Sequence, residues 1–255
     1  MKCNLVNLFF IFLLGILFSC EENIISDTKP RIDVVTKSVD TVNSFSFIYN
    51  GEIYESEYVY NNDSTIVFLS DVVEFISKQL ENNANLASFV HEDGMIEYFD
   101  NVDELQKGIN PLLPEVYDLN FTSKITTSAT LVVFQKDKCK GRTISSQLNS
   151  SIKNVKISTE ILNENNMQDE ISSIDLVCTY MINESSYPVY VGHGNKCIAT
   201  FYEHENYSGH SIWFAVDPNS PHCYIHYFKS YPLYPGSSKN WNDKVSSYTF
   251  SYDSY

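Results

Sequence analysis

The sequence predicts a mainly β protein, a two-sheet sandwich preceded by a small α+β domain. The chain of 255 residues contains 18 tyrosines and 16 phenylalanines, and aromatic residues favour strands. Its C-terminal half contains one hairpin pattern twice, which indicates an internal duplication. Its N-terminal half mixes hairpin signals with a helical spacing of apolar residues. A chain of this length can form two domains that each bury a core.

Residues 1–19 predict a lipoprotein signal peptide. A lysine at the second position precedes an apolar run, Leu5–Leu17, that is too short to span a bilayer comfortably. The sequence Leu-Phe-Ser-Cys that ends at Cys20 resembles a bacterial lipobox, in which the cysteine is acylated. The resemblance implies that lipid on Cys20 tethers the protein to a membrane without a transmembrane helix. An ordinary cleaved signal with an unrelated cysteine is the alternative.

The segment after Cys20 predicts where the protein is displayed. Glu21 and Glu22 resemble the acidic export signals of Bacteroidetes surface lipoproteins. This implies an outer membrane lipoprotein at the cell surface, with the periplasmic face as the second expectation. Residues 20–30 are polar and acidic and predict a flexible tether.

Residues 31–118 predict the small α+β domain, whose function the sequence does not indicate. Ser44–Tyr60 alternate around Asn50-Gly51, a strong signal for a two-residue hairpin turn. Residues 71–86 carry apolar side chains at helical spacing. A second hairpin over 87–99, a short helix over 103–109 and a domain boundary at Pro111 and Pro114 follow.

The acidity is concentrated in the first half of the chain. Residues 20–120 contain 20 acidic and 5 basic side chains, whereas the residues from Phe121 onward contain 12 and 11. This charge argues against nucleic acid or an anionic lipid surface as the partner of the first half. An acidic surface that keeps an exported protein soluble accounts for it. No nucleophile and base stand at a catalytic spacing, so we expect no enzyme.

The duplicated pattern joins a hairpin to a later acid or amide pair and two serines. The second copy reads YEHENYSG over Tyr202–Gly209 and NDKVSS over 242–247, and the first reads FQKDKCKG over Phe134–Gly141 and QDEISS over 168–173. The combination resembles the βγ-crystallin Greek key, whose microbial members often bind calcium. The resemblance places motif one at about 129–177 and motif two at about 197–252 of a domain spanning 125–255.

The resemblance implies a structural role for several residues of the repeated hairpin pattern. Gly141 and Gly209 stand where the fold needs a positive φ, which glycine reaches at the lowest cost. Cys139 replaces the second aromatic residue of the first copy. The packing aromatics are Phe134, Tyr202 and Tyr207, and the serines that bond back to the hairpins are Ser173 and Ser247.

The resemblance also implies calcium sites that take oxygen ligands from both copies, including a backbone carbonyl from the partner copy's hairpin loop, because this hard cation prefers oxygen. The expected ligands of one site are Asn242, Asp243, the Lys244 carbonyl and Ser246. Those of the other are Gln168, Asp169, the Glu170 carbonyl and Ser172. Because Gln168 departs from the acid or asparagine of the consensus, we expect the first site to bind more tightly and the second weakly or not at all. In the alternative interpretation the serines only staple the hairpins.

Four cysteines remain in the C-terminal half once Cys3 and Cys20 are set aside. An exported protein with four cysteines can form two disulfides, in three ways that spacing cannot separate. They are Cys139, Cys178, Cys197 and Cys223. None of their spacings fits a structural zinc site. Five of the six histidines lie in or beside the second copy, where we expect surface loop residues and no transition metal.

The sequence therefore predicts a non-enzymatic surface protein whose fold calcium stabilises. Its expected partners are a membrane, through the N-terminal lipid, and a protein. The alternative is a secreted protease inhibitor of the crystallin fold, with the stiff loop Ser220–Gly236 as the wedge for an enzyme cleft. The insertion 217–239 is rich in tyrosine and proline, and it either forms a recognition surface or covers the sheet beneath it.

Overall fold

The computed structural model describes residues 43–61, 65–109, 126–149, 151–181, 196–216 and 220–252. This part of the chain is mainly β and contains two open sheets, which confirms the fold class at that level. The signal peptide, Cys20, the tether and the proline-containing boundary lie outside the described residues. Within the described segments, no helix combines the length and apolar character that crossing a bilayer requires.

The first hairpin forms where the sequence predicts it. Strand β1 (Asn43–Tyr49) pairs antiparallel with β2 (Glu52–Tyr60). The turn residues Asn50 and Gly51 have φ angles of 53° and 75°, as a tight primed turn requires. The three-residue strand β3 (Ile66–Phe68) then pairs with β2 at the edge of the sheet.

Helix α1 (Asp71–Glu81) is shorter than predicted. The sequence predicts a helix as far as Leu86, but α1 ends at Glu81, and Asn82 is its C-cap residue. The side-chain amide of Asn82 donates to the carbonyl of Lys78. Such bonds compete with the backbone ladder, so the asparagine-rich segment ends the helix early. Leu86 is still buried, in the core beneath α1.

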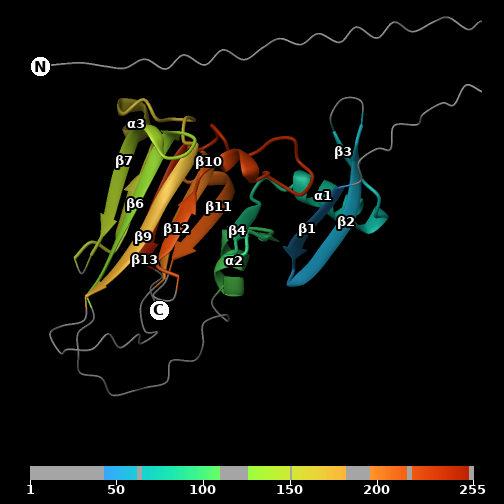
Figure 1. Cartoon of the computed structure of the whole chain (residues 1–255), viewed down its shortest axis with the longest axis horizontal. Helices are drawn as coiled ribbons and strands as arrows, with labels where there is room; N and C mark the ends of the chain where they lie inside the picture. Colours follow the sequence, from blue (N-terminus) through green and yellow to red (C-terminus); the bar gives the residue numbers. More distant parts are fainter. Residues whose placement is uncertain are drawn as a thin grey trace, which may run out of the picture. The chain divides into compact units, whose positions relative to one another are not determined.

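The second hairpin and second helix also form as predicted. They consist of β4 (Ala87–Val90), β5 (Ile96–Phe99) and α2 (Val102–Ile109). Strand β5 pairs parallel with β1, and β4 pairs parallel with β11 (Ser208–Val216). One sheet therefore runs through both predicted regions and continues into β10 (Cys197–His204), β13 (Ser247–Tyr252) and β8 (Asn154–Ile157). Its order is β3-β2-β1-β5-β4-β11-β10-β13-β8, and Figure 1 labels most of these strands.

The C-terminal region adds a second sheet with the order β12-β9-β6-β7. Its strands and those facing it are β6 (Thr126–Lys136), β7 (Lys140–Leu148), β8 (Asn154–Ile157), β9 (Ser173–Met181), β10 (Cys197–His204), β12 (His222–Ile225) and β13 (Ser247–Tyr252). Helix α3 (Thr159–Glu164) and the 3-10 helix η2 (Phe228–Ser230) lie in the connections. The two copies exchange one strand each: β8 of the first pairs with β13, and β12 of the second pairs with β9.

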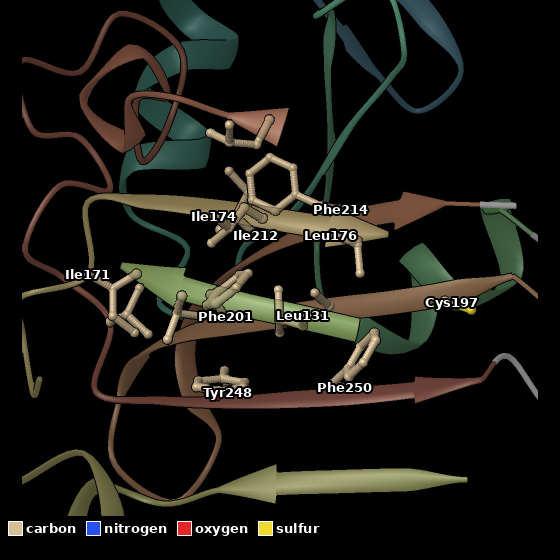
Figure 2. Packing of buried hydrophobic residues seen from close by; sticks show 14 of the residues in the cluster. Leu131, Ile171, Ile174, Leu176, Cys197, Phe201, Ile212, Phe214, Tyr248 and Phe250 are labelled. Atoms are coloured by element: carbon tan, nitrogen blue, oxygen red, sulfur yellow. The ribbon is translucent and has the colours of Figure 1, made fainter. Parts of the chain in front are cut away.

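Apolar side chains from both sheets fill the space between them (Figure 2). Leu131 and Leu176 come from β6 and β9, and Phe201 and Phe250 from β10 and β13; all four are fully buried. Burial of each such side chain stabilises the fold by about 1.5–3 kcal/mol. This core positions the strands of the two sheets, and the duplicated motifs lie at the ends of these strands.

Contacts group residues 40–255 into one compact unit. The boundary expected between separate domains lies within 110–125, outside the described residues. The division into a domain over 31–118 and another over 125–255 therefore stays a prediction. The parallel pairing of β4 with β11 nevertheless shows that the two regions share a sheet.

The aromatic-rich insertion of the second copy covers neighbouring elements. Phe228 and Leu233 are buried, and Tyr231 and Tyr234 pack against the cores of both regions. The Tyr234 hydroxyl donates to Glu81 at the end of α1, at 2.8 Å. Much of this segment is therefore held against the protein, although Tyr224 stays 40% exposed. Such packing leaves fewer of its aromatic side chains available for contact with an enzyme cleft.

Candidate functional site

The two duplicated hairpins, β6–β7 and β10–β11, follow the same backbone course. Each ladder has a register shift at the same place, between Phe134 and Lys136 and between Tyr202 and His204. Three matched positions have positive φ; they are Lys138, Cys139 and Gly141 in the first hairpin and Asn206, Tyr207 and Gly209 in the second. A left-handed conformation costs other residues about 1–2 kcal/mol, which glycine avoids.

A serine closes each hairpin. Its hydroxyl accepts a hydrogen bond from the N–H at the second aromatic position and donates to the carbonyl three residues earlier. The partners of Ser173 are Cys139 (2.9 Å) and Lys136 (2.7 Å), and those of Ser247 are Tyr207 (3.1 Å) and His204 (2.9 Å). Both serines are fully buried, so each hydroxyl satisfies backbone groups that water does not reach.

The segments 168–173 and 242–247 lie side by side. The N–H of Asp169 donates to the Val245 carbonyl at 3.1 Å, and the N–H of Asp243 donates to the Ile171 carbonyl at 3.4 Å. Both aspartates have positive φ, 50° and 55°. This reciprocal pairing relates the two segments by an approximate two-fold rotation and turns each aspartate toward the other copy.

Each aspartate consequently contacts the fifth-position serine of the other copy. Asp243 Oδ1 lies 3.2 Å from Ser172 Oγ, and Asp169 Oδ1 lies 2.7 Å from Ser246 Oγ. These contacts join residues of different segments, whereas the expected ligand sets group Asp243 with Ser246 and Asp169 with Ser172. We name the Asp243–Ser172 cluster site A and the Asp169–Ser246 cluster site B.

Three oxygens converge at site A, next to a cavity of about 410 Å³. Ser172 Oγ lies 3.0 Å from the Gln135 carbonyl oxygen and 3.2 Å from Asp243 Oδ1. A hydroxyl carries one proton, so it cannot donate fully to both oxygens at once. The cluster is therefore rich in lone pairs and poor in protons, a suitable environment for a hard cation.

Further carboxylates line the same cavity. Asp137 and Glu170 lie around Asp243, and Lys229 Nζ pairs with Asp137 at 2.6 Å. Partial burial raises the pKa of the Asp243 carboxyl, and the charges of Glu170, Asp137 and Asp169 raise it further. A cation bound among these groups would offset their repulsion.

In both sites the first-position amide donates to the aspartate that follows it. Asn242 Nδ2 lies 2.6 Å from Asp243 Oδ2, and Gln168 Nε2 lies 3.5 Å from Asp169 Oδ2. The longer side chain of Gln168 thus makes the weaker bond.

Site B differs from site A in its charge. Glu170, third in its segment, accepts a hydrogen bond from the Gln135 side chain at 2.7 Å. In the other copy, Lys244 stands at the position of Glu170 and Glu203 at the position of Gln135. The pKa of the Glu203 carboxyl is lowered, first by His210, 3.0 Å away, and also by the charge of Lys244. The segment that supplies Ser246 to site B thus has Lys244 at the position where the segment that supplies Ser172 to site A has Glu170.

The predicted ligands do not include Gln135, Asp137 or Lys229, which line the cavity at site A. The alignment of the repeats could have found Gln135 and Asp137, because both fall inside the first hairpin signature. No pattern marks Lys229, which η2 brings to the cavity. Among the described residues, no group of three or more histidine, cysteine, aspartate or glutamate side chains is arranged to hold a metal ion. A site at these positions depends on carbonyl and hydroxyl oxygens.

The predicted cysteines take different positions. Cys139 lies in the first hairpin, with its sulfur 3.9 Å from the Ile174 carbonyl oxygen. Cys223 lies on β12, where burial raises the pKa of its thiol to about 11. Cys178 and Cys197 are buried, on β9 and β10.

Comparisons with protein-family models, with curated proteins and with solved structures found no match to this chain.

Proposed function

We propose that this protein is an exported, lipid-anchored bacterial surface protein with a calcium-binding Greek-key sandwich of the βγ-crystallin type. Its role is non-enzymatic, and calcium stabilises the folded state because it binds that state and not the unfolded chain. The proposed anchor is Cys20, with Glu21 and Glu22 as the surface-export signal. The outer membrane is the proposed location and the cell surface the proposed side.

The strand exchange supports the Greek-key assignment. Each copy contributes its first, second and fourth strands to one sheet and its third strand to the other, β8 in one case and β12 in the other. The same exchange brings segments 168–173 and 242–247 together, because each follows the third strand of its copy. A duplicated Greek key accounts for both features.

The convergence of Ser172, the Gln135 carbonyl and Asp243 carries the calcium proposal. Site A combines these oxygens with a cavity and the carboxylates of Glu170 and Asp137, whereas in site B the position that matches Glu170 is Lys244. We therefore assign the tighter binding to site A. Asp243, which the sequence placed in the stronger site, stays there, but Ser172 replaces Ser246 as its partner.

Thermal unfolding in millimolar calcium and in chelator tests the proposal on the full chain. Calcium at about 100 times its dissociation constant adds about 2.7 kcal/mol to the free energy of unfolding. We expect Asp243→Asn to remove most of this gain and the matched control Asp169→Asn to remove less. Calorimetric titration gives the dissociation constants. A melting temperature that does not respond to calcium would sink the proposal.

A double-mutant cycle tests the crossed pairing of the ligands. Residues that share a site lose calcium affinity non-additively, and residues in different sites lose it additively. Asp243→Asn and Ser172→Ala should therefore be non-additive, whereas Asp243→Asn and Ser246→Ala should add. The reverse result would restore the grouping that the sequence suggested.

A further inference from the structure

Cys178 and Cys197 face each other between the two sheets. Their sulfur atoms are 3.6 Å apart, although β9 and β10 belong to different sheets. Both cysteines belong to the buried cluster of the core, and Figure 2 shows Cys197 at one end of it. The two cysteines are 19 positions apart in the sequence, so a bond between them would join the sheets and also close a loop.

Backbone pairing fixes the positions of both residues. Cys178 is opposite Ala129 on β6, and Cys197 is opposite Val216 on one side and Tyr252 on the other. The pKa of the Tyr252 hydroxyl is raised to about 12, mainly by burial and also by the two neighbouring cysteines. A disulfide has a sulfur–sulfur distance of about 2.0 Å, so the two sulfurs, which are 3.6 Å apart, must still move closer to bond.

The other two cysteines do not fit together in this way. Residues of a strand alternate between its faces, and on β12 His222 and Tyr224 are exposed while Cys223 is half-buried. The Tyr224 hydroxyl interacts with Cys139. Cys139 and Cys223 therefore lie toward opposite faces of β12.

We infer that Cys178 and Cys197 form a disulfide in the exported protein, an inference that rests on the proposed export to an oxidising compartment. The two thiols lose two protons and two electrons, and an external disulfide such as oxidised glutathione accepts them and becomes two thiols. Cys139 and Cys223 remain thiols. This selects one of the pairings that the sequence left open.

Burial determines when the bond forms. Cys178 is 3% exposed and Cys197 is fully buried, so a soluble oxidant cannot reach them readily in the folded state. The disulfide therefore forms while the chain folds. Once formed, it is protected from reductant and should raise the melting temperature by about 5–15 °C.

Peptide mapping after refolding tests the pairing. The full chain is unfolded with reductant, refolded in oxidised and reduced glutathione, alkylated and digested without reduction. Cleavage after Lys196 and Glu203 places Cys178, Cys197 and Cys223 on separate peptides. We expect a linked pair of Cys178 and Cys197 peptides, with Cys139 and Cys223 alkylated. Alkylation of Cys178 and Cys197, or linkage of either to another cysteine, would overturn the inference.

Matched variants test the effect of the disulfide on stability, independently of the peptide mapping. Reductant present during refolding should lower the melting temperature of the wild type and of the Cys139→Ser/Cys223→Ser control alike, but not that of Cys178→Ser/Cys197→Ser. If the serine variant fails to fold, the mapping of the wild type still decides. Protein trapped by alkylation in cells tests the compartment separately: thiols in the cell together with a disulfide after refolding would contradict the proposed export and support the pairing.

Discussion

The two copies of the motif share a backbone but differ in the side chains around it. Positive φ angles, register shifts and serine bonds recur at matched positions of both hairpins. The second aromatic position, by contrast, is Tyr207 in one copy and Cys139 in the other. A glycine and a serine are thus the residues that both copies retain at the hairpin, while the aromatic residue can change.

The charges have diverged further than the hairpins. Glu170, Asp137 and Lys229 line the cavity at site A, whereas Lys244 stands in the other copy at the position of Glu170. Glu170 and Lys244 occupy the third position of the ligand segments, which the repeated signature leaves open. Cation affinity in the two sites should therefore depend on positions that the repeated signature does not specify.

The largest difference between the hairpins should appear at their glycines. A Cβ on Gly209 would lie 2.6 Å from the His204 ring, whereas one on Gly141 would lie 3.2 Å from the flexible Gln135 side chain. Both have positive φ, so alanine costs about 1–2 kcal/mol at either position. The closer contact should add about 1 kcal/mol at Gly209. Urea unfolding of Gly209→Ala and Gly141→Ala measures both; an equal loss would mean that His204 moves away freely.

Replacing the buried serine should cost about the same stability in both hairpins, because the serine bonds recur in both copies. Ser173→Ala and Ser247→Ala each leave a buried N–H and a carbonyl without their hydroxyl partner. Each change should lower the free energy of unfolding by about 1–3 kcal/mol. Ser208→Ala, an exposed change in the second hairpin, is the control. If one variant lost much more than the other, the two hairpins would not be energetically equivalent.

Local patterns predicted the elements of this fold more reliably than their connections. Asn50-Gly51 specifies a turn by its own backbone preference, so the first hairpin was predictable. The early end of α1 at Asn82 was not, because side-chain bonds there compete with an apolar pattern that continues to Leu86. The parallel pairing of β4 with β11 joins residues far apart in the sequence, and no local pattern encodes it.

In the candidate site too, the residues were predictable from the sequence but the way they group was not. The residues Asp169, Asp243, Ser172 and Ser246 follow from the repeated signature, but their grouping depends on how two distant segments pair. Reciprocal backbone bonds cross the segments, which composition and spacing cannot show. Lys229 reaches the cavity only because η2 packs beside the first hairpin.

A cysteine in the second hairpin would make it resemble the first. The rings of Tyr202 and Tyr207 pack edge to face, with centroids 5.9 Å apart, and Lys156 Nζ lies 5.4 Å from the Tyr207 ring centroid. Tyr207→Cys removes both contacts and should cost about 0.5–1.5 kcal/mol. Cys139→Ser in the first hairpin, where no such ring pair exists to be lost, should cost less. Chemical unfolding in reductant measures both, and a cost-free Tyr207→Cys would show that the aromatic corner adds no stability.

The smallest expected difference is a pH dependence confined to the second hairpin. His210 Nε2 donates to the Asn83 carbonyl at 2.9 Å, and its Nδ1 lies 3.0 Å from Glu203, a distance that fits an ion pair without good hydrogen-bond alignment. The carbonyl can only accept, so Nε2 carries a proton, and a second proton on Nδ1 creates the ion pair. The matched residue of the first hairpin is Arg142, which stays charged throughout.

Glu203, the largest cause, raises the pKa of His210 in the folded protein. The ion pair between His210 and Glu203 therefore contributes fully to stability below about pH 6.5, the pKa of histidine in the unfolded chain. This contribution is lost as the pH rises through the higher pKa of His210 in the folded protein. The free energy of unfolding, measured in urea from pH 5 to 9, should fall with rising pH more in the wild type than in His210→Gln. Arg142→Gln should leave that slope unchanged. Parallel curves for wild type and His210→Gln would show that the ion pair contributes nothing, and the two hairpins would then differ in packing alone.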